Sequence, residues 1–238
     1  MAGSPNPTIR EELLSPTTRE YLAQIYRLSD RVGGSDSAEA YVSTSALADL
    51  LDVSAPAVNR MVTKLREMGL LLHEPYRGIS LTEPGEREAL KELRRHRIAE
   101  AFLVTVMGFQ WHEIHEEAER MSRALGETVA ERMAQMAGYP QFCPHGEPIP
   151  NADGTLAQLN DVLLADVKTE QELEITRVRT RDSDRLQYLA ALGLTPGTHI
   201  SLLHAAPFHG PLQLKVGSEY RIIGHNLAEL IRVKPIQL

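Results

Sequence analysis

Histidines and carboxylates recur at helical spacing in two segments of this 238-residue chain. In RRHRIAEAF, His96 and Glu100 stand at positions i and i+4, which places them one above the other on one face of a helix. In WHEIHEEAER, four metal-binding side chains fall within an arc of about 100° at 3.6 residues per turn: His112, His115, Glu116 and Glu119. Imidazole and carboxylate groups gathered in this way are suitable ligands for a divalent cation.

A third segment, QFCPHGEPIP, contains the single cysteine of the chain two residues before a histidine. Proline removes a backbone donor that a helix needs, so Cys143 and His145 are expected in a loop. Alone, Cys143 could be a small buried hydrophobic residue or a redox-sensing thiol. An isolated His–Glu pair at i and i+4 is usually a surface interaction of about 0.2–0.5 kcal/mol. The two helical patches and the Cys–Pro–His segment together predict a metal site.

The elements that precede these residues follow the order of a DNA-binding unit. Apolar residues recur at helical spacing over residues 18–31, and a short helix is expected over residues 45–52. Ser54 as N-cap, with a proline in the first turn, predicts the start of a further helix, which ends before Gly69. The stretch LLLHEPYRGISLT, residues 70–82, predicts two short strands around a turn. A helix pair followed by a hairpin is the pattern of a winged helix-turn-helix.

The second helix of such a unit can enter the major groove of DNA with its N-terminal residues at base edges. Asn59 is suited to pair with adenine and Arg60 with guanine, and each good pair contributes about 1–3 kcal/mol of discrimination. Lys64 and Arg77, the latter at the hairpin tip, suit phosphates, which position the protein without reading the sequence. The residues predicted to contact DNA are Ser54, Ala55, Pro56, Ala57, Asn59, Arg60, Lys64 and Arg77.

Charge is distributed unevenly along the chain, whose net charge is −7. Residues 53–97 carry nine Lys or Arg against six Asp or Glu, whereas residues 111–133 carry six acids against three bases. A basic segment before an acidic, histidine-bearing one is consistent with a DNA-binding surface followed by a cation site. The alternative for the basic segment is a three-helix fold with a solvated polar face.

The rest of the chain predicts a helical middle part and a small β domain. Long helices are expected over residues 85–107 and 111–136, and a short one over residues 156–167. The Pro- and Gly-rich stretch 138–154 predicts a loop that leads into a linker. From Glu172 onward, short β-like runs and one helix, SDRLQYLAALG, predict a small β-barrel-like domain.

Composition excludes several classes of protein. The apolar fraction of 42% and charged fraction of 24% are those of an ordinary globular protein. The single cysteine excludes an intrachain disulfide. We find no pattern typical of a signal peptide or of a membrane span. We therefore expect a cytoplasmic protein without a membrane partner. The sequence contains no HExxH, P-loop or G-x-S-x-G motif, so we expect neither an enzyme nor a small organic substrate.

The order of winged helix, RRHRIAEAF, HEIHEEAER, CPHGEPIP, linker and β domain resembles the diphtheria-toxin-repressor family, particularly its manganese-responsive branch. The resemblance covers the chain from about Thr17 to Leu238. It implies a mainly α fold with a small β domain, in a homodimeric, metal-activated repressor that binds double-stranded operator DNA. The implied domains are a winged helix-turn-helix at 1–84 with a disordered N-terminal tail, a helical dimerisation and metal domain at 85–147, a linker at 148–168 and an SH3-like domain at 169–238.

The resemblance also implies ligands, in two sites. The primary site falls on Glu20, His96 and Glu119. Two further primary positions hold Ser122 and Arg123 in this chain, and because arginine cannot ligate a cation, a neighbour such as Glu116 would have to complete the site.

The secondary site implied by the resemblance falls on Glu100, Cys143, His145 and an acid of the C-terminal domain, Asp182 or alternatively Asp184. Other family members use the equivalents of His96, Glu100 and His115 with that acid. Since both sets contain Glu100, they are expected to overlap around one site.

These observations predict a metal-dependent transcriptional regulator of metal-ion uptake or homeostasis genes. Mn²⁺ is expected from the resemblance, Fe²⁺ also suits oxygen and nitrogen ligands, and the thiol of Cys143 favours a softer ion such as Zn²⁺. The alternatives are a thiol-based redox-sensing transcription factor acting through Cys143 and, less favoured, a metallohydrolase using the same carboxylates.

Overall fold

The structure is a computed structural model that describes residues 14–33, 41–168 and 170–236; the expected N-terminal tail lies outside these residues. The chain forms two compact units. One contains the residues up to Leu93 together with Ala152–Thr155, and the other contains Arg94–Asn151 and Leu156–Leu238. The units divide within a helix, and the domain boundaries expected after residues 84, 147 and 168 stay predictions.

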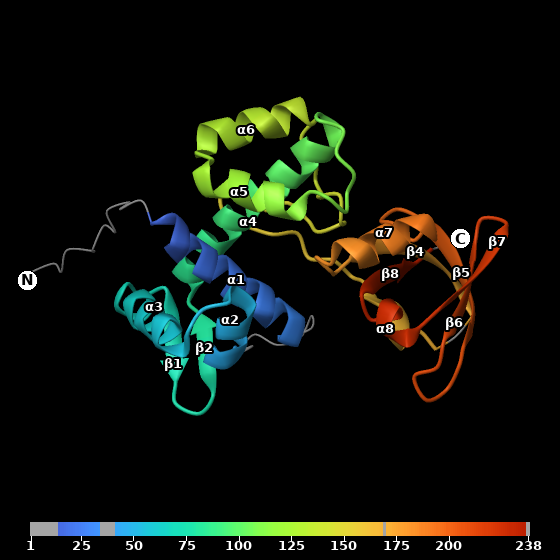
Figure 1. Cartoon of the computed structure of the whole chain (residues 1–238), viewed down its shortest axis with the longest axis horizontal. Helices are drawn as coiled ribbons and strands as arrows, with labels where there is room; N and C mark the ends of the chain where they lie inside the picture. Colours follow the sequence, from blue (N-terminus) through green and yellow to red (C-terminus); the bar gives the residue numbers. More distant parts are fainter. Residues whose placement is uncertain (1–13, 34–40, 169, 237–238) are drawn as a thin grey trace, which may run out of the picture. The chain divides into compact units, whose positions relative to one another are not determined.

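The N-terminal unit contains the predicted helix pair and hairpin, drawn in blue to cyan in Figure 1. Its elements are α1 (Pro16–Gly33), α2 (Thr44–Leu51), α3 (Ala55–Glu67), β1 (Leu71–Glu74) and β2 (Gly78–Leu81). Ser43 caps α2 by accepting a hydrogen bond from the backbone N–H of Ala46, and Asp52 ends the helix in the left-handed conformation. Ser54 precedes α3, which has a proline in its first turn. The predicted winged helix-turn-helix is therefore present.

One apolar cluster holds the N-terminal unit together. It contains Leu22 and Ile25 of α1, Leu47 of α2 and, on the inner face of α3, Val58, Val62 and Leu65. The three α3 residues recur at i, i+4 and i+7, so the opposite face of the helix is left to solvent. An isolated antiparallel β-bridge between Val42 and Ile79 connects the hairpin to this core.

The helical part of the second unit differs from its prediction in one respect. α4 (Glu83–Thr105) is continuous, but the helix expected over residues 111–136 is two helices, α5 (His115–Ala124) and α6 (Glu127–Met136). The break falls at Leu125, whose backbone is extended, and Gly126, which stands at the N-cap of α6. Glycine is a poor helix former, whereas the apolar periodicity continues through the break and hides it. Because α5 begins at His115, His112 is not on this helix, and the predicted arc of four ligands is not formed.

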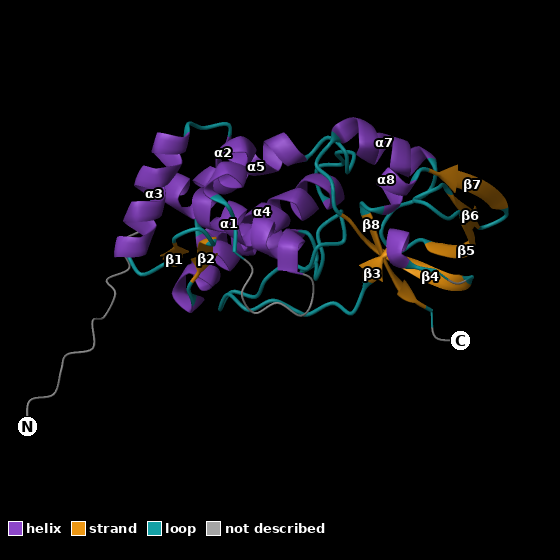
Figure 2. Cartoon of the chain, turned by 90° about the horizontal axis from the view of Figure 1, so that it is seen from below, coloured by secondary structure: helices purple, strands orange, loops and turns teal. Residues whose placement is uncertain are grey.

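The C-terminal part is a six-stranded antiparallel sheet with two helices, seen in orange and purple in Figure 2. Its elements are β3 (Val162–Leu163), β4 (Gln171–Val178), α7 (Ser183–Ala191), β5 (His199–Ala205), β6 (Leu212–Val216), β7 (Glu219–Ile223), α8 (His225–Ala228) and β8 (Ile231–Pro235), with strand order β3-β8-β4-β5-β6-β7. Residues of α7 and α8 share an apolar core with the strands. The helix expected over residues 156–167 is wrong: Val162 and Leu163 pair with β8, and a single 3-10 turn follows.

None of the helices among the described residues is both long and apolar enough to span a lipid bilayer.

Candidate functional site

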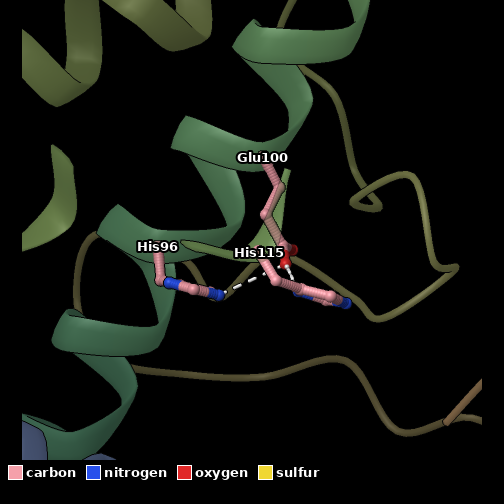
Figure 3. Close-up of side chains that lie close together, drawn as sticks. All are labelled: His96, Glu100 and His115. Carbon is pink, nitrogen blue, oxygen red and sulfur yellow. Dashed lines mark ion pairs between the residues drawn. The ribbon is translucent and has the colours of Figure 1, made fainter. Parts of the chain in front are cut away.

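Glu100 lies at the centre of a buried group of histidines. Its Oε1 atom is 3.2 Å from Nε2 of His96, 3.0 Å from Nδ1 of His115 and 3.6 Å from Nδ1 of His145. His96 and Glu100 stand one turn apart on α4, and His115 is the first residue of α5. Figure 3 shows the side chains of His96 and His115 pointing to the carboxylate of Glu100. The i, i+4 spacing therefore places His96 and Glu100 on one face of α4, and the start of α5 brings His115 to the same carboxylate.

The orientation of His145 is set by a backbone group. Its Nε2 lies 2.9 Å from the carbonyl oxygen of Trp111, and because a carbonyl only accepts, Nε2 must carry the proton. In the neutral ring, Nδ1 then presents a lone pair toward Glu100. The ring stacks on His115 with centroids 4.3 Å apart and on Trp111 with centroids 5.4 Å apart. His145 is thus held in the tautomer and orientation of a metal ligand.

Several nitrogen atoms of this group are buried without a hydrogen bond. They are both ring nitrogens of His115 and Nδ1 of His145. Nδ1 of His115 approaches Glu100 to 3.0 Å but lacks the alignment of a hydrogen bond. Since an unsatisfied buried polar group costs about 1–3 kcal/mol, such a cluster calls for an explanation. A divalent cation fits, because it would use these lone pairs and compensate the charge of Glu100.

The protonation states suit ligation. Burial raises the pKa of Glu100, but the adjacent His96, His115 and His145 outweigh burial and bring the pKa well below its usual range. Burial also lowers the pKa of His115, against the opposing effect of Glu100. At neutral pH, Glu100 is therefore a carboxylate and His115 a neutral imidazole, the forms in which these residues bind a metal.

Two sets of side chains offer ligand atoms that all lie within 4.8 Å of one another. One is His96, Glu100 and His115; the other is Glu100, Cys143 and His145. Among the residues that the structure describes, these are the groups of three or more potential ligands. Both contain Glu100, so they form one centre with overlapping options.

The other predicted ligands have different neighbours. Glu116 is exposed on α5. Glu119 lies 2.7 Å from the guanidinium of Arg123 and 3.9 Å from that of Arg181. Two permanent cations therefore face its carboxylate where the resemblance implied a primary metal ligand. Ser122 is buried and donates a hydrogen bond to the backbone carbonyl of Glu119.

The acid expected from the C-terminal domain is also engaged elsewhere. Asp182 caps α7 by accepting a hydrogen bond of 3.1 Å from the backbone N–H of Arg185. Its side chain is 48% exposed and belongs to neither ligand set, nor does that of Asp184. Glu20 lies on α1, in the N-terminal unit. Ligation by these residues stays a prediction.

Most of the predicted DNA-contacting residues lie at the start or on the outer face of α3, and Arg77 lies in the wing. Val58, Val62 and Leu65 are buried on its inner side. The exposed residues at the start of the helix and along its outer face are Ser54, Ala55, Pro56, Asn59, Arg60 and Lys64, and Ala57 is half-buried. Arg77 in the wing stacks over the ring of Tyr41 at 4.0 Å and lies 3.3 Å from Glu74. The fully exposed Tyr76 at the wing tip was not among the predicted contacts, because no helical or strand pattern distinguishes a turn residue.

An exposed helix-turn-helix face together with a buried histidine, carboxylate and thiol centre defines a metal-responsive DNA-binding protein. Comparison with known families agrees. Residues 13–79 match the family described as "Iron dependent repressor, N-terminal DNA binding domain", and residues 82–151 match "Iron dependent repressor, metal binding and dimerisation domain". Residues 162–235 match "FeoA domain".

Similar proteins cover almost the whole chain. The iron-dependent repressor IdeR of Mycobacterium tuberculosis is 28% identical over 236 residues, which span 94% of this chain and 99% of that protein. The structure of a manganese-dependent transcriptional repressor in complex with manganese is 30% identical, with a TM-score of 0.82 and coverage of 92% of this chain and 100% of the other. The apo form of the manganese-activated repressor ScaR is 32% identical, with a TM-score of 0.76 and coverage of 91% and 100%.

The chain therefore belongs to the iron-dependent repressor family, which includes the diphtheria toxin repressor. It is a metal-dependent transcriptional regulator and not an enzyme, and the family consists of DNA-binding, dimerising repressors. The predicted family, function and fold class, including the SH3-like C-terminal domain, are confirmed.

Proposed function

We propose that this chain is a cytoplasmic metal sensor that binds its double-stranded DNA operator as a metal-stabilised homodimer and controls genes of metal-ion uptake or homeostasis. The observation that carries the proposal is the convergence of three histidines on the buried carboxylate of Glu100, with nitrogen atoms left without hydrogen bonds. A divalent cation bound there would use these lone pairs and compensate the charge of Glu100.

The ligands we propose are His96, Glu100, His115, Cys143 and His145. When bound, the metal would supply a positive charge that ties α4, α5 and the loop of Cys143 together. The carbonyl of Trp111 keeps the proton of His145 on Nε2, and His96, Glu100, Cys143 and His145 are buried away from water. Burial and the charge of Glu100 raise the pKa of Cys143 well above its usual value, so metal binding through this sulfur would release a proton.

Mn²⁺ is the proposed physiological ion, with Fe²⁺ second. Oxygen and nitrogen ligands suit both ions, and the similar proteins include a manganese-dependent repressor and the iron-dependent repressor IdeR. Zn²⁺ is a further candidate where Cys143 takes part, since thiolates favour softer ions. ScaR, the manganese-activated repressor, has been solved with Cd²⁺ and with Zn²⁺.

Operator binding is proposed for the outer face of α3. Asn59 and Arg60 are exposed near the start of the helix, where a recognition helix meets base edges. Lys64 lies one turn further along, and the wing carries Arg77 with Tyr76 beside it. The half-site spacing would then follow from the symmetry of the dimer.

A set of exposed apolar side chains supports the proposed homodimer. In the region that matches the metal-binding and dimerisation domain, these are Val106, Met107, Val129, Met136, Tyr139 and Phe142. Exposed apolar side chains mark a protein interface where they form one contiguous patch, which is what we propose for this region. A two-fold dimer would use the same surface on both copies.

The remaining predicted ligands lack this support. Glu20, Glu116 and Glu119 stay proposed contributors to a primary-type site, and Asp182 stays a proposed contributor to the site around Glu100. Arg123, beside Glu119, is a permanent cation at a position where the resemblance implied a ligand. We therefore propose the centre around Glu100 as the one that switches DNA binding.

The test is operator binding by the purified full-length protein titrated with Mn²⁺ and then with EDTA. Typical coupling of about 1–3 kcal/mol predicts an operator affinity roughly 5- to 150-fold higher with metal. Equal affinity in Mn²⁺ and in EDTA would overturn the proposed switch.

Cys143→Ser separates ligation from thiol sensing. Redox-sensing thiols are exposed and have a low pKa, whereas Cys143 is buried and its pKa is raised. We expect the variant to bind Zn²⁺ more weakly and to show the same insensitivity to hydrogen peroxide as the wild type. A peroxide response in the wild type that the variant loses would favour the thiol sensor.

A further inference from the structure

The loop that carries two of the proposed ligands is held by contacts with the C-terminal sheet. We call residues Cys143–Glu147 the metal loop. Within it, the backbone N–H of Gly146 donates to the carbonyl of Cys143, and that of Cys143 to the carbonyl of Glu147. Outside it, the carbonyl of His145 accepts a hydrogen bond of 2.9 Å from the backbone N–H of Val178, at the end of β4. The metal loop therefore contacts the C-terminal sheet through its backbone.

Gly146 allows this close approach. Its φ is +83°, which favours glycine, and a Cβ atom there would lie 1.9 Å from the carbonyl oxygen of Thr176 on β4. Any other residue would push the metal loop away from the strand. The position of Cys143 and His145 thus depends on contact with β4.

Glu147 makes the second attachment, and it is electrostatic. Its Oε2 lies 3.3 Å from the guanidinium of Arg97 on α4 and 3.4 Å from that of Arg177 on β4. Its Oε1 lies 3.6 Å from the guanidinium of Arg179. The side chain of Glu147 is only 18% exposed, so these charges interact with less screening than they would at the surface.

The sheet side of this attachment is rigidly built. Arg177 donates to both carboxylate oxygens of the buried Asp161, at 2.8 and 2.7 Å. Arg232 of β8 donates to the same carboxylate at 2.6 Å. Bidentate arginine–carboxylate pairs fix geometry as well as energy. The guanidinium that meets Glu147 is therefore held in place by the C-terminal domain.

We propose that Glu147 is a positioning residue of the metal centre, through which the C-terminal domain sets the place of Cys143 and His145. The proposal rests on the proposed function of these two residues as ligands. This role of the C-terminal domain is separate from the ligand expected at Asp182, whose side chain caps α7.

The test uses the full-length protein and Co²⁺, whose bond to a thiolate gives a near-ultraviolet charge-transfer absorption. We expect Glu147→Gln to need about 10- to 100-fold more free Co²⁺ for half-maximal absorption than the wild type, as for loss of other residues that orient ligands. The matched control is Glu131→Gln, which removes another arginine-paired carboxylate, 2.7 Å from Arg94. The control should behave as the wild type does.

A second readout needs no metal. Cys143 is the single cysteine and is buried, so its alkylation rate in the metal-free protein reports how firmly the metal loop is held. Glu147→Gln should be alkylated about 10-fold faster than the wild type or than Glu131→Gln. A purely distant effect on folding would appear in circular dichroism of the whole chain instead.

The outcomes separate the two proposals. If the wild type shows the absorption and Cys143→Ser does not, Cys143 is a ligand; wild-type-like affinity and alkylation in Glu147→Gln would then overturn the positioning role alone. If the wild type shows no thiolate absorption, the ligand role of Cys143 falls and the inference with it. If Glu147→Gln fails to fold, Arg179→Gln is used instead, because it removes one of the three cations around Glu147. The proposal then requires a smaller increase in the Co²⁺ concentration for half-maximal absorption.

Discussion

Glu100 is the one residue that both ligand sets share, and its carboxylate faces three imidazoles in a buried site. Neutral nitrogen ligands do not compensate the charge of a divalent cation. In a buried site, few water molecules are present to solvate that charge. The negative charge of Glu100 therefore determines whether a cation can remain there.

Glu100→Gln should abolish metal binding at this centre. The amide keeps the size of the side chain but removes the charge, so we expect the Mn²⁺ affinity to fall by more than the roughly 100-fold that the loss of a ligand-orienting residue can cost. Isothermal titration calorimetry of the full-length protein measures it. Glu88→Gln, on the same helix and paired with Lys91, is the control, and unchanged Mn²⁺ affinity in Glu100→Gln would contradict the assignment.

Asp161 predicts a pH dependence of stability. Burial raises the pKa of its carboxyl, but hydrogen bonds from Arg177, Arg232 and Thr176 outweigh burial, and the pKa is lowered. A depressed folded-state pKa contributes stability that is present above the unfolded-state pKa of about 3.9 and is lost as the pH falls through the folded-state pKa. Asp161→Asn should cost about 3–5 kcal/mol at neutral pH, because two partly buried arginines lose their counter-charge.

The measurement for Asp161 is urea unfolding of wild type and variant between neutral and acid pH. The stability difference should shrink as the pH falls into the acid range. If the difference in unfolding free energy between wild type and variant stayed constant with pH, the ionised carboxylate of Asp161 would not be the source of the stabilisation.

At the scale of elements, α3 is expected to separate base reading from phosphate contact. Asn59→Ala or Arg60→Ala should each cost about 1–3 kcal/mol of operator binding and relax the preference at one base position. Lys64→Ala should weaken binding to all sequences alike and reduce the salt slope by about 1. Fluorescence anisotropy on operator and scrambled DNA at several salt concentrations distinguishes these patterns. Equal losses on both DNAs for Asn59→Ala and Arg60→Ala would remove them from base recognition.

The close contact between the metal loop and β4 predicts that Gly146 cannot be replaced without loss of stability. Gly146→Ala should lower the free energy of unfolding by about 1–3 kcal/mol, because it adds a clash with Thr176 to an unfavourable backbone conformation. Gly138→Ala is a matched control, since Gly138 has a φ of +80° with no atom within 4 Å of the added Cβ. Equal losses in the two variants, by chemical denaturation, would show that only the backbone conformation matters at Gly146.

At the scale of the whole molecule, association of two copies is expected to be a condition for operator binding. Met136→Glu places a charge on an exposed apolar side chain of α6 within the region that matches the dimerisation domain. Burying that charge in an interface is costly, so the variant should be monomeric and bind the operator at least 10-fold more weakly. Light scattering after gel filtration measures the mass. Tyr188→Glu, equally exposed on α7, should remain a dimer, and a dimeric Met136→Glu would place the interface elsewhere.

The parts of this molecule that the sequence predicts are those decided by local spacing. Ser54 and the following proline predict the start of α3, and the i, i+4 spacing of His96 and Glu100 predicts their common face. By contrast, the break at Gly126 is hidden by an apolar pattern that continues across it. Val162 forms a strand only because Val233, seventy-one positions later, supplies the partner.

For the candidate site too, the sequence predicts what local spacing decides and misses contacts between distant segments. The convergence of His145 on Glu100 was expected from the family resemblance, since no local pattern relates two residues forty-five positions apart. The arginines around Glu147 and the pairing of Glu119 with Arg181 depend on where β4 and the segment after it lie in the fold. Periodicity describes one element at a time and carries no information about such neighbours.

Trp111 is the single tryptophan of the chain, and its indole ring stacks on His145 while also packing against the C-terminal core. Its emission therefore originates at one known place, where the candidate metal centre and the C-terminal sheet meet. Paramagnetic ions such as Mn²⁺ and Co²⁺ quench a nearby indole, and solvent entering between the two regions would shift its emission to longer wavelength. Occupancy of the centre and loosening of the C-terminal domain thus have separate optical signatures in the unlabelled, native protein.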